Sequence, residues 1–307
     1  MQLFQQLNEL AVELQNKPFL HEFFSENQPE AYAQVGWLES MHRNKWLIAG
    51  NRAGKTVCAG IQIMADSLGI DILTKGVSKR FPPEKQKRSL RSWVVSDTED
   101  TSIDIVQKTI VSDILGQDEA GFLWNFVDDS CSYTEQGGFK NGVLSFTNDS
   151  SIRFKFSTQK RKTFQGASLD IVWLDEEQPK DIYDECRARV IDSRGFIMGT
   201  LTPIYERLRG IPWLYYDLYL QRHQKNVEFH NWSLLHNPYI EEEAKQELIS
   251  EWDEDQREVR INGMFVPMGV TLAFPGSLLK QVREDVIKPQ SGQIRFNEEG
   301  KPELAVA

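Results

Sequence analysis

The sequence has few cysteines and no long hydrophobic run. Its three cysteines, Cys58, Cys131 and Cys186, are far apart and lack CxxC spacing, so neither a disulfide framework nor a zinc site is expected. No stretch approaches the roughly 18 consecutive apolar residues of a membrane span, and the N-terminus lacks the apolar block of a signal peptide. These absences predict a soluble, cytoplasmic protein with no membrane partner.

An excess of positive charge is also missing. The 307 residues carry a formal net charge of −10, which argues against tight, non-specific DNA binding by the chain as a whole but allows a local basic patch. Residues 74–91 are rich in lysine and arginine, including Arg80, and have one acid. We expect a long exposed loop there, which is either a solvated connection or a contact to the DNA backbone.

The strongest motif lies at residues 46–56. It consists of an apolar strand (46–49), a turn of mostly small residues (50–54) and the start of a helix at Lys55. The turn favours backbone N–H groups that close around a β-phosphate, and the helix N-terminus adds a favourable dipole. Lys55 is expected to reach the β- and γ-phosphates, and the Thr56 hydroxyl to bind Mg²⁺. Ala49 stands where the consensus has its first glycine, and alanine is small enough for the cradle to survive. The residues expected to bind ATP are Gly50, Asn51, Arg52, Ala53, Gly54, Lys55 and Thr56.

A second motif, residues 171–177, is a hydrophobic run that ends in three acids. A buried parallel strand delivers such a carboxylate to the carboxyl edge of a sheet, where open α/β folds bind ligands. Asp175 is therefore the expected Mg²⁺ partner, directly or through water, and Glu176 is expected to orient and deprotonate the attacking water. Alone, the motif would more often be a solvated strand end; together with Lys55 it predicts ATP hydrolysis.

Other patterns predict the remaining elements of an α/β fold. A helical lead-in runs to about residue 43, and an alternation of apolar and polar residues predicts a β-hairpin over residues 143–156. The further expected elements are a helix over 56–68 ended by Gly69, a strand over 93–96, a helix over 101–114, a helix over 179–190 and a strand over 195–199.

Two arginines and two threonines are further candidates for the catalytic site. Arg161, between two lysines, is a candidate for an arginine finger supplied to a neighbouring subunit, and Arg52 is the competing candidate within the same chain. Arg161 is equally well a plain surface charge. Thr200 and Thr202 follow a strand expected next to the one that carries Asp175. Their hydroxyls would bond the γ-phosphate or its attacking water and so sense which nucleotide is bound. The alternative is that this segment is only a turn that ends the strand.

The ordered set of motifs resembles the large terminase subunit of tailed bacteriophages. The motifs that carry the resemblance are residues 50–56, 155–159, 164–166, 171–177 and 200–203, with later similar stretches at 237–240, 260–265 and Gly269. The resemblance extends over roughly residues 30 to 275, which is most of the chain. The specificity lies in the order of the set, because each motif alone is short.

The resemblance implies a P-loop ATPase of the additional-strand, catalytic-glutamate type. Its fold would be a mainly parallel sheet flanked by helices, with the antiparallel hairpin added and a small helical C-terminal subdomain. The implied organisation is a lead-in over 1–43, an ATPase core over 44–235 and a linker subdomain over 236–307. In that family a glutamine upstream of the cradle commonly contacts adenine, which implies Gln34, or less well Gln28. The family also implies that Thr200 and Thr202 couple hydrolysis to movement.

The implied function is a motor that uses ATP and Mg²⁺ to drive double-stranded DNA into a procapsid in the host cytoplasm. Its implied partners are the portal protein, the small terminase subunit and further copies of the chain in a ring. Residues 269–307 are too few for the nuclease domain of large terminases, so we expect no DNA cleavage; that domain is either missing from this piece or a separate polypeptide. Two alternatives stay open: a helicase-like or recombination ATPase, and a non-catalytic nucleotide-binding assembly subunit.

Overall fold

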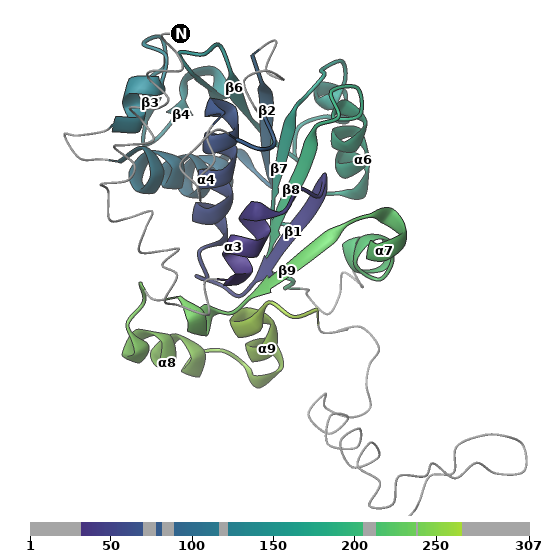
Figure 1. The fold of residues 1–307 in the computed structure, drawn as a ribbon. Coiled ribbons are helices and arrows are strands. Elements are labelled where there is room, and N and C mark those ends of the chain that lie inside the picture. Colours follow the sequence, from purple (N-terminus) through teal and green to yellow (C-terminus); the bar gives the residue numbers. More distant parts are fainter. Residues whose placement is uncertain are drawn as a thin grey trace, which may run out of the picture. The chain divides into compact units, whose positions relative to one another are not determined.

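A mainly parallel sheet forms the centre of the molecule. The computed structural model describes residues 32–69, 78–81, 89–116, 122–204, 213–237 and 239–265. The strands of the main sheet are β1 (Asn44–Ala49), β2 (Arg91–Ser96), β5 (Val143–Ser145), β6 (Ser151–Phe156), β7 (Ile171–Asp175), β8 (Phe196–Leu201) and β9 (Glu228–Trp232). They lie in the order β5-β6-β2-β7-β8-β1-β9 (Figure 1). All neighbours are parallel except β5, which is antiparallel to β6, so the predicted hairpin is confirmed.

Helices and short turns connect these strands. The α-helices are α3 (Tyr32–Glu39), α4 (Lys55–Leu68), α5 (Glu99–Thr101), α6 (Lys180–Arg189), α7 (Arg222–Lys225), α8 (Glu242–Ser250) and α9 (Glu254–Asn262). Wider or tighter helical turns are η2 (Ser102–Gln107), η3 (Ile110–Gly116), η4 (Phe122–Phe126), η5 (Lys140–Gly142), η6 (Arg161–Phe164), η7 (Leu214–Tyr219) and η8 (Leu234–His236). A separate small antiparallel pair consists of β3 (Tyr133–Thr134) and β4 (Gly138–Phe139).

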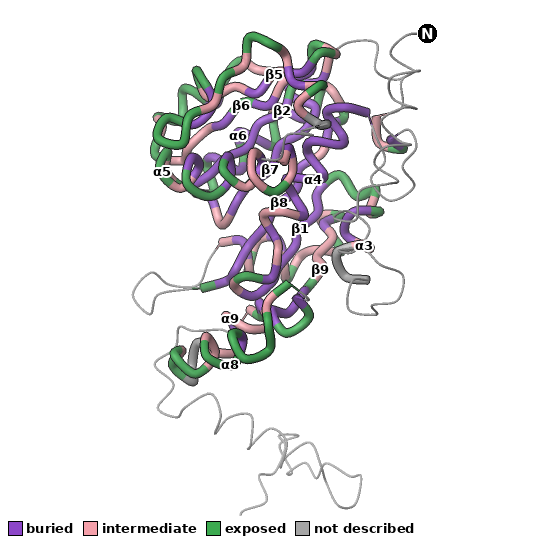
Figure 2. The backbone as a smooth tube through the Cα atoms, turned by 90° about the vertical axis from the view of Figure 1, so that its left-hand side faces the viewer, coloured by how far each residue is buried: buried purple, intermediate pink, exposed green. Residues whose placement is uncertain are grey.

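Each face of the sheet has its own hydrophobic core, because successive side chains of a strand point to opposite faces. On β1, Leu47 packs with the α4 side, where Ile63 lies, and Trp46 packs with the α6 side, where Ile182 lies. Figure 1 shows α4 and α6 on these opposite sides. Figure 2 shows that the central strands are buried whereas α8 is largely exposed. The sheet is thus covered on both faces, as parallel sheets generally are.

A glycine in β8 makes room for the large side chain of Trp46. A Cβ on Gly199 would lie 2.2 Å from the Trp46 ring, so any other residue would displace the indole. The ring is fully buried and stacks on Phe229 of β9 at a centroid distance of 6.4 Å. Trp46 thus packs β1 against its neighbours β8 and β9, next to the turn over residues 50–54, which we call the phosphate loop.

The strand order brings three carboxyl ends together. β8 lies between β1, which leads into the phosphate loop, and β7, which carries the acids. Asp175 at the end of β7 is the register partner of Thr200 on β8, and Leu47 of β1 is the partner of the same threonine. This additional strand between the two motifs is the arrangement expected from the resemblance. The P-loop fold prediction is confirmed.

The helix predictions also agree with the structure. α4 ends at Gly69, whose left-handed backbone caps the helix by donating its N–H to the carbonyls of Ala65 and Asp66. α6 lies within the expected range, and helical turns run from α5 to η3 over the segment expected to be a helix. Among the described residues, no helix is both long and apolar enough to cross a lipid bilayer.

The basic segment 74–91 is only partly described, and one of its residues contradicts the expectation. Arg80 is not exposed: its side chain is 8% accessible and pairs with Asp66 of α4 at 3.6 Å. It also donates to the Ser40 carbonyl at 2.5 Å. This guanidinium is therefore a structural cation and is unavailable to a DNA backbone. Residues 70–77 and 82–88 lie outside the described residues.

The predicted domain boundaries stay predictions. By contacts between Cα atoms, the chain divides into the units Met1–Val266 and Pro267–Ala307, and all the described residues lie in the first. The lead-in is described only from α3 onward, and the helical subdomain as α8 and α9.

Candidate active site

Lys55, the first residue of α4, lies at the centre of the carboxyl edge. Its side chain is buried, and its Nζ donates to the carbonyl of Gly50 at 2.9 Å and to Thr202 Oγ1 at 2.5 Å. Burial lowers the pKa of this lysine, and the nearby carboxyl groups of Glu176 and Asp175 oppose that shift. The predicted phosphate-binding lysine therefore lies beside the predicted metal partner Asp175, the predicted base Glu176 and one of the predicted coupling threonines, Thr202.

Asp175 is fixed by a chain of hydrogen bonds across the sheet. The Trp173 indole donates from Nε1 to Thr200 Oγ1 at 2.9 Å, and Thr200 Oγ1 donates to Asp175 Oδ1 at 3.0 Å. Burial, and then the charge of Glu176, raise the pKa of Asp175 to about 7, although the bond from Thr200 and the charge of Lys55 act against this. A buried carboxyl group with these surroundings favours a cation as a partner.

Glu176 has a strained backbone that turns its side chain back toward β8. Its φ is 64°, a left-handed conformation that is uncommon for glutamate and that occurs often at functional sites. Its N–H donates to the Thr200 carbonyl at 2.8 Å, and its Oε2 accepts from the Thr202 N–H at 2.9 Å. Gln178 Nε2 donates to the preceding carbonyl, that of Asp175, at 2.8 Å. Burial raises the pKa of the Glu176 carboxyl, against the opposing effects of Lys55 and the Thr202 N–H.

The backbone of the phosphate loop bonds to residues from the C-terminal part of the described chain. Gly50 N–H donates to the Trp232 carbonyl at 3.2 Å, and Asn51 N–H donates to the Arg260 carbonyl at 2.8 Å. A Cβ on Gly50 would lie 2.2 Å from the Ile261 carbonyl oxygen, so glycine is required for this close approach to the end of α9. Gly50 stands one residue after the first glycine of the phosphate-binding consensus, and this contact explains why glycine is needed there.

The two candidate arginines lie in different surroundings. Arg52 is exposed and has a left-handed backbone with a φ of 59°, and its carbonyl accepts from Asn237 Nδ2 at 2.6 Å. Arg161, in η6, donates from Nε and Nη2 to Glu185 Oε1 of α6 at 3.0 and 2.7 Å. Hydrogen bonding and charge attraction by Glu185 raise the pKa of Arg161. The second arginine thus has an acidic partner within its own chain.

The structure brings together five of the predicted residues through direct hydrogen bonds: Lys55, Asp175, Glu176, Thr200 and Thr202. Thr56 follows in the first turn of α4 and is half-buried, and Ala53 and Gly54 complete the loop. Gln34 lies in α3 with its side chain outside the described part, and Gln28 lies outside the described residues altogether.

Sequence reasoning missed three residues that support this site: Trp173, Gln178 and Asn237. Trp173 appeared only as part of the apolar run, although a tryptophan two residues before Asp175, the candidate metal ligand, points to the same face of the strand as that acid. Asn237 had a visible signal, since it opens a stretch that carries the family resemblance. Its contact with residue 52 spans 185 positions, and only the fold reveals it.

The donor set fits Mg²⁺ held mainly by a nucleotide. Within the described ranges, histidine, cysteine and acidic side chains form no cluster of three suited to holding a metal. Mg²⁺ in nucleotide sites usually takes one or two protein oxygens and completes its shell with phosphate and water. Asp175, whose pKa is raised by burial, and the hydroxyl of Thr56 are oxygen donors of that kind.

Comparisons with known proteins agree with this geometry, although no family model matches the chain. The large subunit of the terminase of Salmonella phage P22 is 26% identical over 292 residues, which is 90% of this chain and 56% of that protein. The resemblance to large terminase subunits is confirmed. The chain thus spans little more than half the length of the P22 terminase subunit.

Solved structures show the same terminase fold at low sequence identity. The large terminase of a thermophilic bacteriophage has a TM-score of 0.58 at 12% identity, over 76% of this chain and 53% of that one. The ATPase domain of the Thermus phage P74-26 large terminase has a TM-score of 0.55 at 13% identity, over 80% of this chain and 97% of that domain. The first of these terminases was also solved in complex with ADP, with a TM-score of 0.51.

Proposed function

We propose that this chain hydrolyses ATP and that hydrolysis drives double-stranded DNA into a viral procapsid. The observation that carries the proposal is the bonded series from Lys55 to Thr202 and from Thr202 to Glu176. It links the candidate phosphate-binding cation to the candidate base through one residue. The P22 relative is a terminase subunit, and one of the similar terminase structures contains ADP, so nucleotide is the ligand we assign to the loop.

The chain's own residues divide the work of hydrolysis. Lys55 Nζ now donates to the Gly50 carbonyl and Thr202 Oγ1, and it would exchange these for phosphate oxygens when ATP enters. Oriented donors in a buried site stabilise developing charge without reorganisation. The loss of the bond to Lys55 frees Thr202 Oγ1, so Thr202 is placed to respond to the γ-phosphate. We assign the coupling role to Thr202 for this reason.

Glu176 is the candidate general base. Its Oε2 accepts from the Thr202 N–H, so we assign Oε1 to the proton of the attacking water. Burial raises the pKa of this carboxyl, which brings its proton affinity nearer to that useful at neutral pH. Mg²⁺, when bound by Thr56 and Asp175, would neutralise phosphate charge.

The wider role is a packaging motor in the host cytoplasm. Its proposed partners are double-stranded DNA, the portal protein, the small terminase subunit and further copies of this chain in a ring. The sequence relative named above favours this role over the helicase-like, recombination and non-catalytic alternatives.

Two arginines compete for the role of stabilising the transition state, which is worth roughly 10³ to 10⁵ in rate. Arg52 would act within its own chain, since it stands in the phosphate loop. Arg161 would act on a neighbour and would first have to leave Glu185. If Arg161 holds the role, Arg161→Ala should remove the rise of specific activity with protein concentration. If Arg52 holds it, Arg52→Ala should lower activity at every concentration.

Steady-state ATP hydrolysis over a range of protein concentrations tests the proposal. Glu176→Gln should lower kcat by at least about 100-fold because it removes the proton acceptor. Glu177→Gln, one residue on in the same motif, is the matched control and should retain most activity. Equal rates in wild type and Glu176→Gln, with ADP still bound, would reject Glu176 as the base.

A further inference from the structure

Asn237 makes a contact with the phosphate loop that neither the motifs nor the family resemblance assigns. Its side chain lies just after η8 and is buried, with 7% accessibility. Nδ2 donates to the Arg52 carbonyl at 2.6 Å, and Oδ1 accepts from the Tyr239 N–H at 2.9 Å. Both ends of the amide are therefore used, and the amide is fixed in orientation by its own turn.

The carbonyl that Asn237 holds belongs to the most unusual residue of the loop. Arg52 has a φ of 59°, which is disfavoured for any residue with a Cβ. A peptide unit is planar and trans, so a carbonyl that points toward Asn237 turns the N–H of Ala53 the opposite way. The bond thus selects one orientation of the peptide between residues 52 and 53.

The neighbouring residues are held by the same part of the chain. Gly50 N–H donates to the Trp232 carbonyl at 3.2 Å and Asn51 N–H donates to the Arg260 carbonyl at 2.8 Å. Three successive loop residues, 50 to 52, therefore take their backbone partners from residues 232–260. Of these partners, the Asn237 amide is the one that a side-chain substitution removes directly.

We propose that Asn237 is a positioning residue that holds the phosphate loop in its nucleotide-binding shape. This inference rests on the proposed function, since it requires that the loop binds nucleotide. A preformed loop avoids the cost of ordering on binding, so loss of the bond weakens binding. ATP and ADP share the phosphates that the loop surrounds, so both lose affinity by a similar factor.

Asn148 provides a matched control, because it makes the same pair of bonds elsewhere. Its Nδ2 donates to the Ser67 carbonyl at 3.0 Å, and its Oδ1 accepts from the Ser150 N–H at 3.1 Å. Serine is the substitution of choice at both sites. Ser233, in the same segment as Asn237, shows that a serine keeps the turn, since its Oγ accepts from the Leu235 N–H at 3.2 Å. A serine at position 237 or 148 is too short to reach the carbonyl to which the asparagine amide donates.

The experiment measures the Kd of ADP and of ATP-γ-S by calorimetry for wild type, Asn237→Ser and Asn148→Ser, together with melting temperatures without nucleotide. We expect Asn237→Ser to weaken both nucleotides about tenfold, the loss of one good hydrogen bond, and Asn148→Ser to leave both unchanged. Both variants should lose similar thermal stability. In turnover, Asn237→Ser should raise KM by the same factor and change kcat by less than about twofold.

Three results would overturn the inference. Equal affinities of wild type and Asn237→Ser would show that the bond does not shape the loop. Equal weakening in both serine variants would show a general loss of stability. Absence of binding by wild type would overturn the proposed function itself, and the inference with it. Should Asn237→Ser fail to fold, Asn237→Asp and Asn148→Asp replace the pair, measured at high salt, which screens the added charge.

Discussion

The two ends of β1 each bury a lysine, and the difference between them separates structure from function. Lys45 near the amino end is 2% accessible, and Lys55, beyond the carboxyl end, is 8% accessible. Burial lowers the pKa of both. Residue type and burial are therefore alike, and the roles differ because of the groups around each ammonium.

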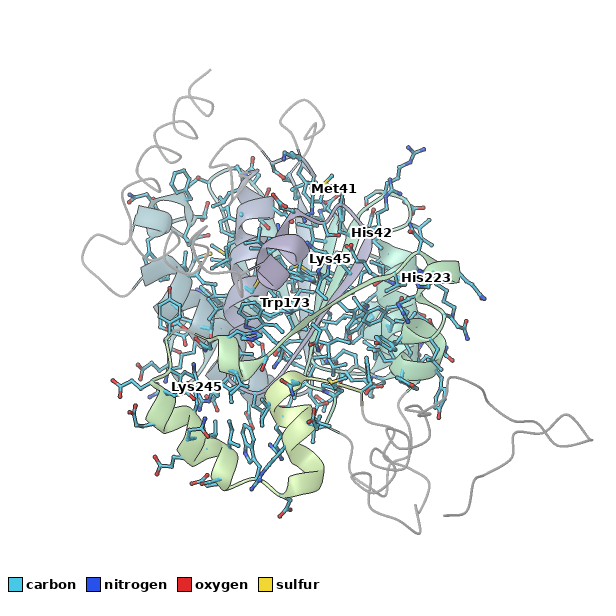
Figure 3. All side chains as sticks on the ribbon, turned by 60° about the horizontal axis from the view of Figure 1, so that its bottom comes forward. Met41, His42, Lys45, Trp173, His223 and Lys245 are labelled. Atoms are coloured by element: carbon cyan, nitrogen blue, oxygen red, sulfur yellow. The ribbon has the colours of Figure 1, made fainter. Side chains whose placement is uncertain are left out.

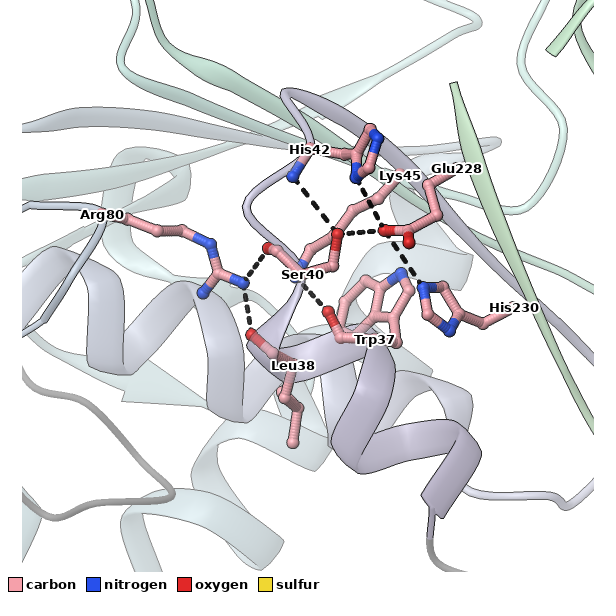
Figure 4. Close-up of polar contacts among 8 residues, drawn as sticks. All are labelled: Trp37, Leu38, Ser40, His42, Lys45, Arg80, Glu228 and His230. Atoms are coloured by element: carbon pink, nitrogen blue, oxygen red, sulfur yellow. Dashed lines mark hydrogen bonds and ion pairs between the residues drawn. The ribbon is translucent and has the colours of Figure 1, made fainter. Parts of the chain in front are cut away.

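At the amino end, the charged side chains have polar or charged partners within the chain, and Figure 4 shows those of Lys45, Arg80 and Glu228. Lys45 Nζ donates to the Trp37 carbonyl and lies 4.2 Å from the centre of the Trp37 ring. Asp66 pairs with Arg80 at 3.6 Å, and Glu228 lies 3.2 Å from nitrogens of both His42 and His230. In Figure 3, Lys45 lies within the body of the molecule and Met41, half-exposed, lies near its border. This cluster fastens α3 to β1 and β9.

At the carboxyl end, the buried Asp175 and the half-buried Glu176 share one lysine. Burial raises the pKa of both Asp175 and Glu176, and their mutual repulsion adds to the shift of Asp175. Trp173, labelled in Figure 3, is fully buried beneath them. A site that lacks positive charge in this way suits a divalent cation, which would in turn attract the phosphates of a nucleotide. The local balance of charge, and not burial alone, therefore distinguishes the candidate site from the amino end.

The largest expected contrast comes from exchanging each lysine for methionine. Lys55→Met should lower ATP hydrolysis by about 10³-fold or more, because it removes a preorganised cation, and should cost stability of the same order as Lys45→Met, since the Gly50 carbonyl and Thr202 Oγ1 lose their donor. Lys45→Met should lower stability by about 1–3 kcal/mol, since the Trp37 carbonyl loses its donor, and should keep nucleotide binding. Calorimetry and turnover measure both. Loss of nucleotide binding by a folded Lys45→Met protein would contradict the purely structural role of Lys45.

The second-largest expected effect is a dependence of stability on pH that comes from Asp175 at the carboxyl end. In the folded protein the pKa of Asp175 is raised from 3.8 to about 7. Between these values the native state holds a proton that the unfolded state has lost, so the stability of the metal-free protein falls as pH rises from about 4 to about 7. The Asp175 contribution is at most about 4 kcal/mol.

Urea unfolding at pH 4.5 and 7.5, without metal, measures this contribution as the difference between wild type and Asp175→Asn. The variant should lose less stability than wild type on raising the pH. Asp192→Asn, at an exposed position, is the control and should follow wild type. Parallel curves for wild type and Asp175→Asn would mean that burial does not raise the pKa of Asp175.

A smaller effect is expected from the hydroxyl that joins Trp173 to Asp175. Thr200→Val leaves the indole N–H and the carboxyl group without this partner, at a cost of about 1–3 kcal/mol in stability. Thr200→Ser keeps the hydroxyl and should recover most of the loss. Melting temperatures of the pair measure the effect. Equal losses in both variants would contradict the assignment to the hydroxyl, because Thr200→Ser retains it.

Sequence patterns predicted the carboxyl end better than the amino end, for a physical reason. The candidate residues for phosphate and metal binding lie at the carboxyl ends of strands or in the loop that follows one, so the fold class alone places them at one edge. Lys55, Asp175 and Glu176 were found in this way, and so were the two threonines. The roles assigned to them stay predictions that the experiments above test.

The amino-end cluster was not predictable, because its members come from segments that only the tertiary fold joins. Arg80 belongs to a stretch of basic residues typical of an exposed loop, yet it pairs with an acid of α4. Glu228 was in no motif, and β9 itself was missed, since Glu228–Trp232 is polar at three of five positions. An edge strand that is only partly buried has a weak alternating pattern.

The smallest expected effect is that of His42→Ala at the rim of the amino-end cluster. The His42 side chain is 44% accessible, and its Nδ1 lies 3.2 Å from Glu228 Oε2, a carboxylate that His230 and Ser40 also contact. An exposed pair of this kind contributes about 0–1 kcal/mol, and the remaining partners keep the carboxylate satisfied. The melting temperature should therefore shift by only a few degrees, and ADP affinity should stay the same. A loss as large as that of Lys45→Met would place the centre of the cluster at Glu228 and not at the lysine, because His42 contacts the glutamate directly.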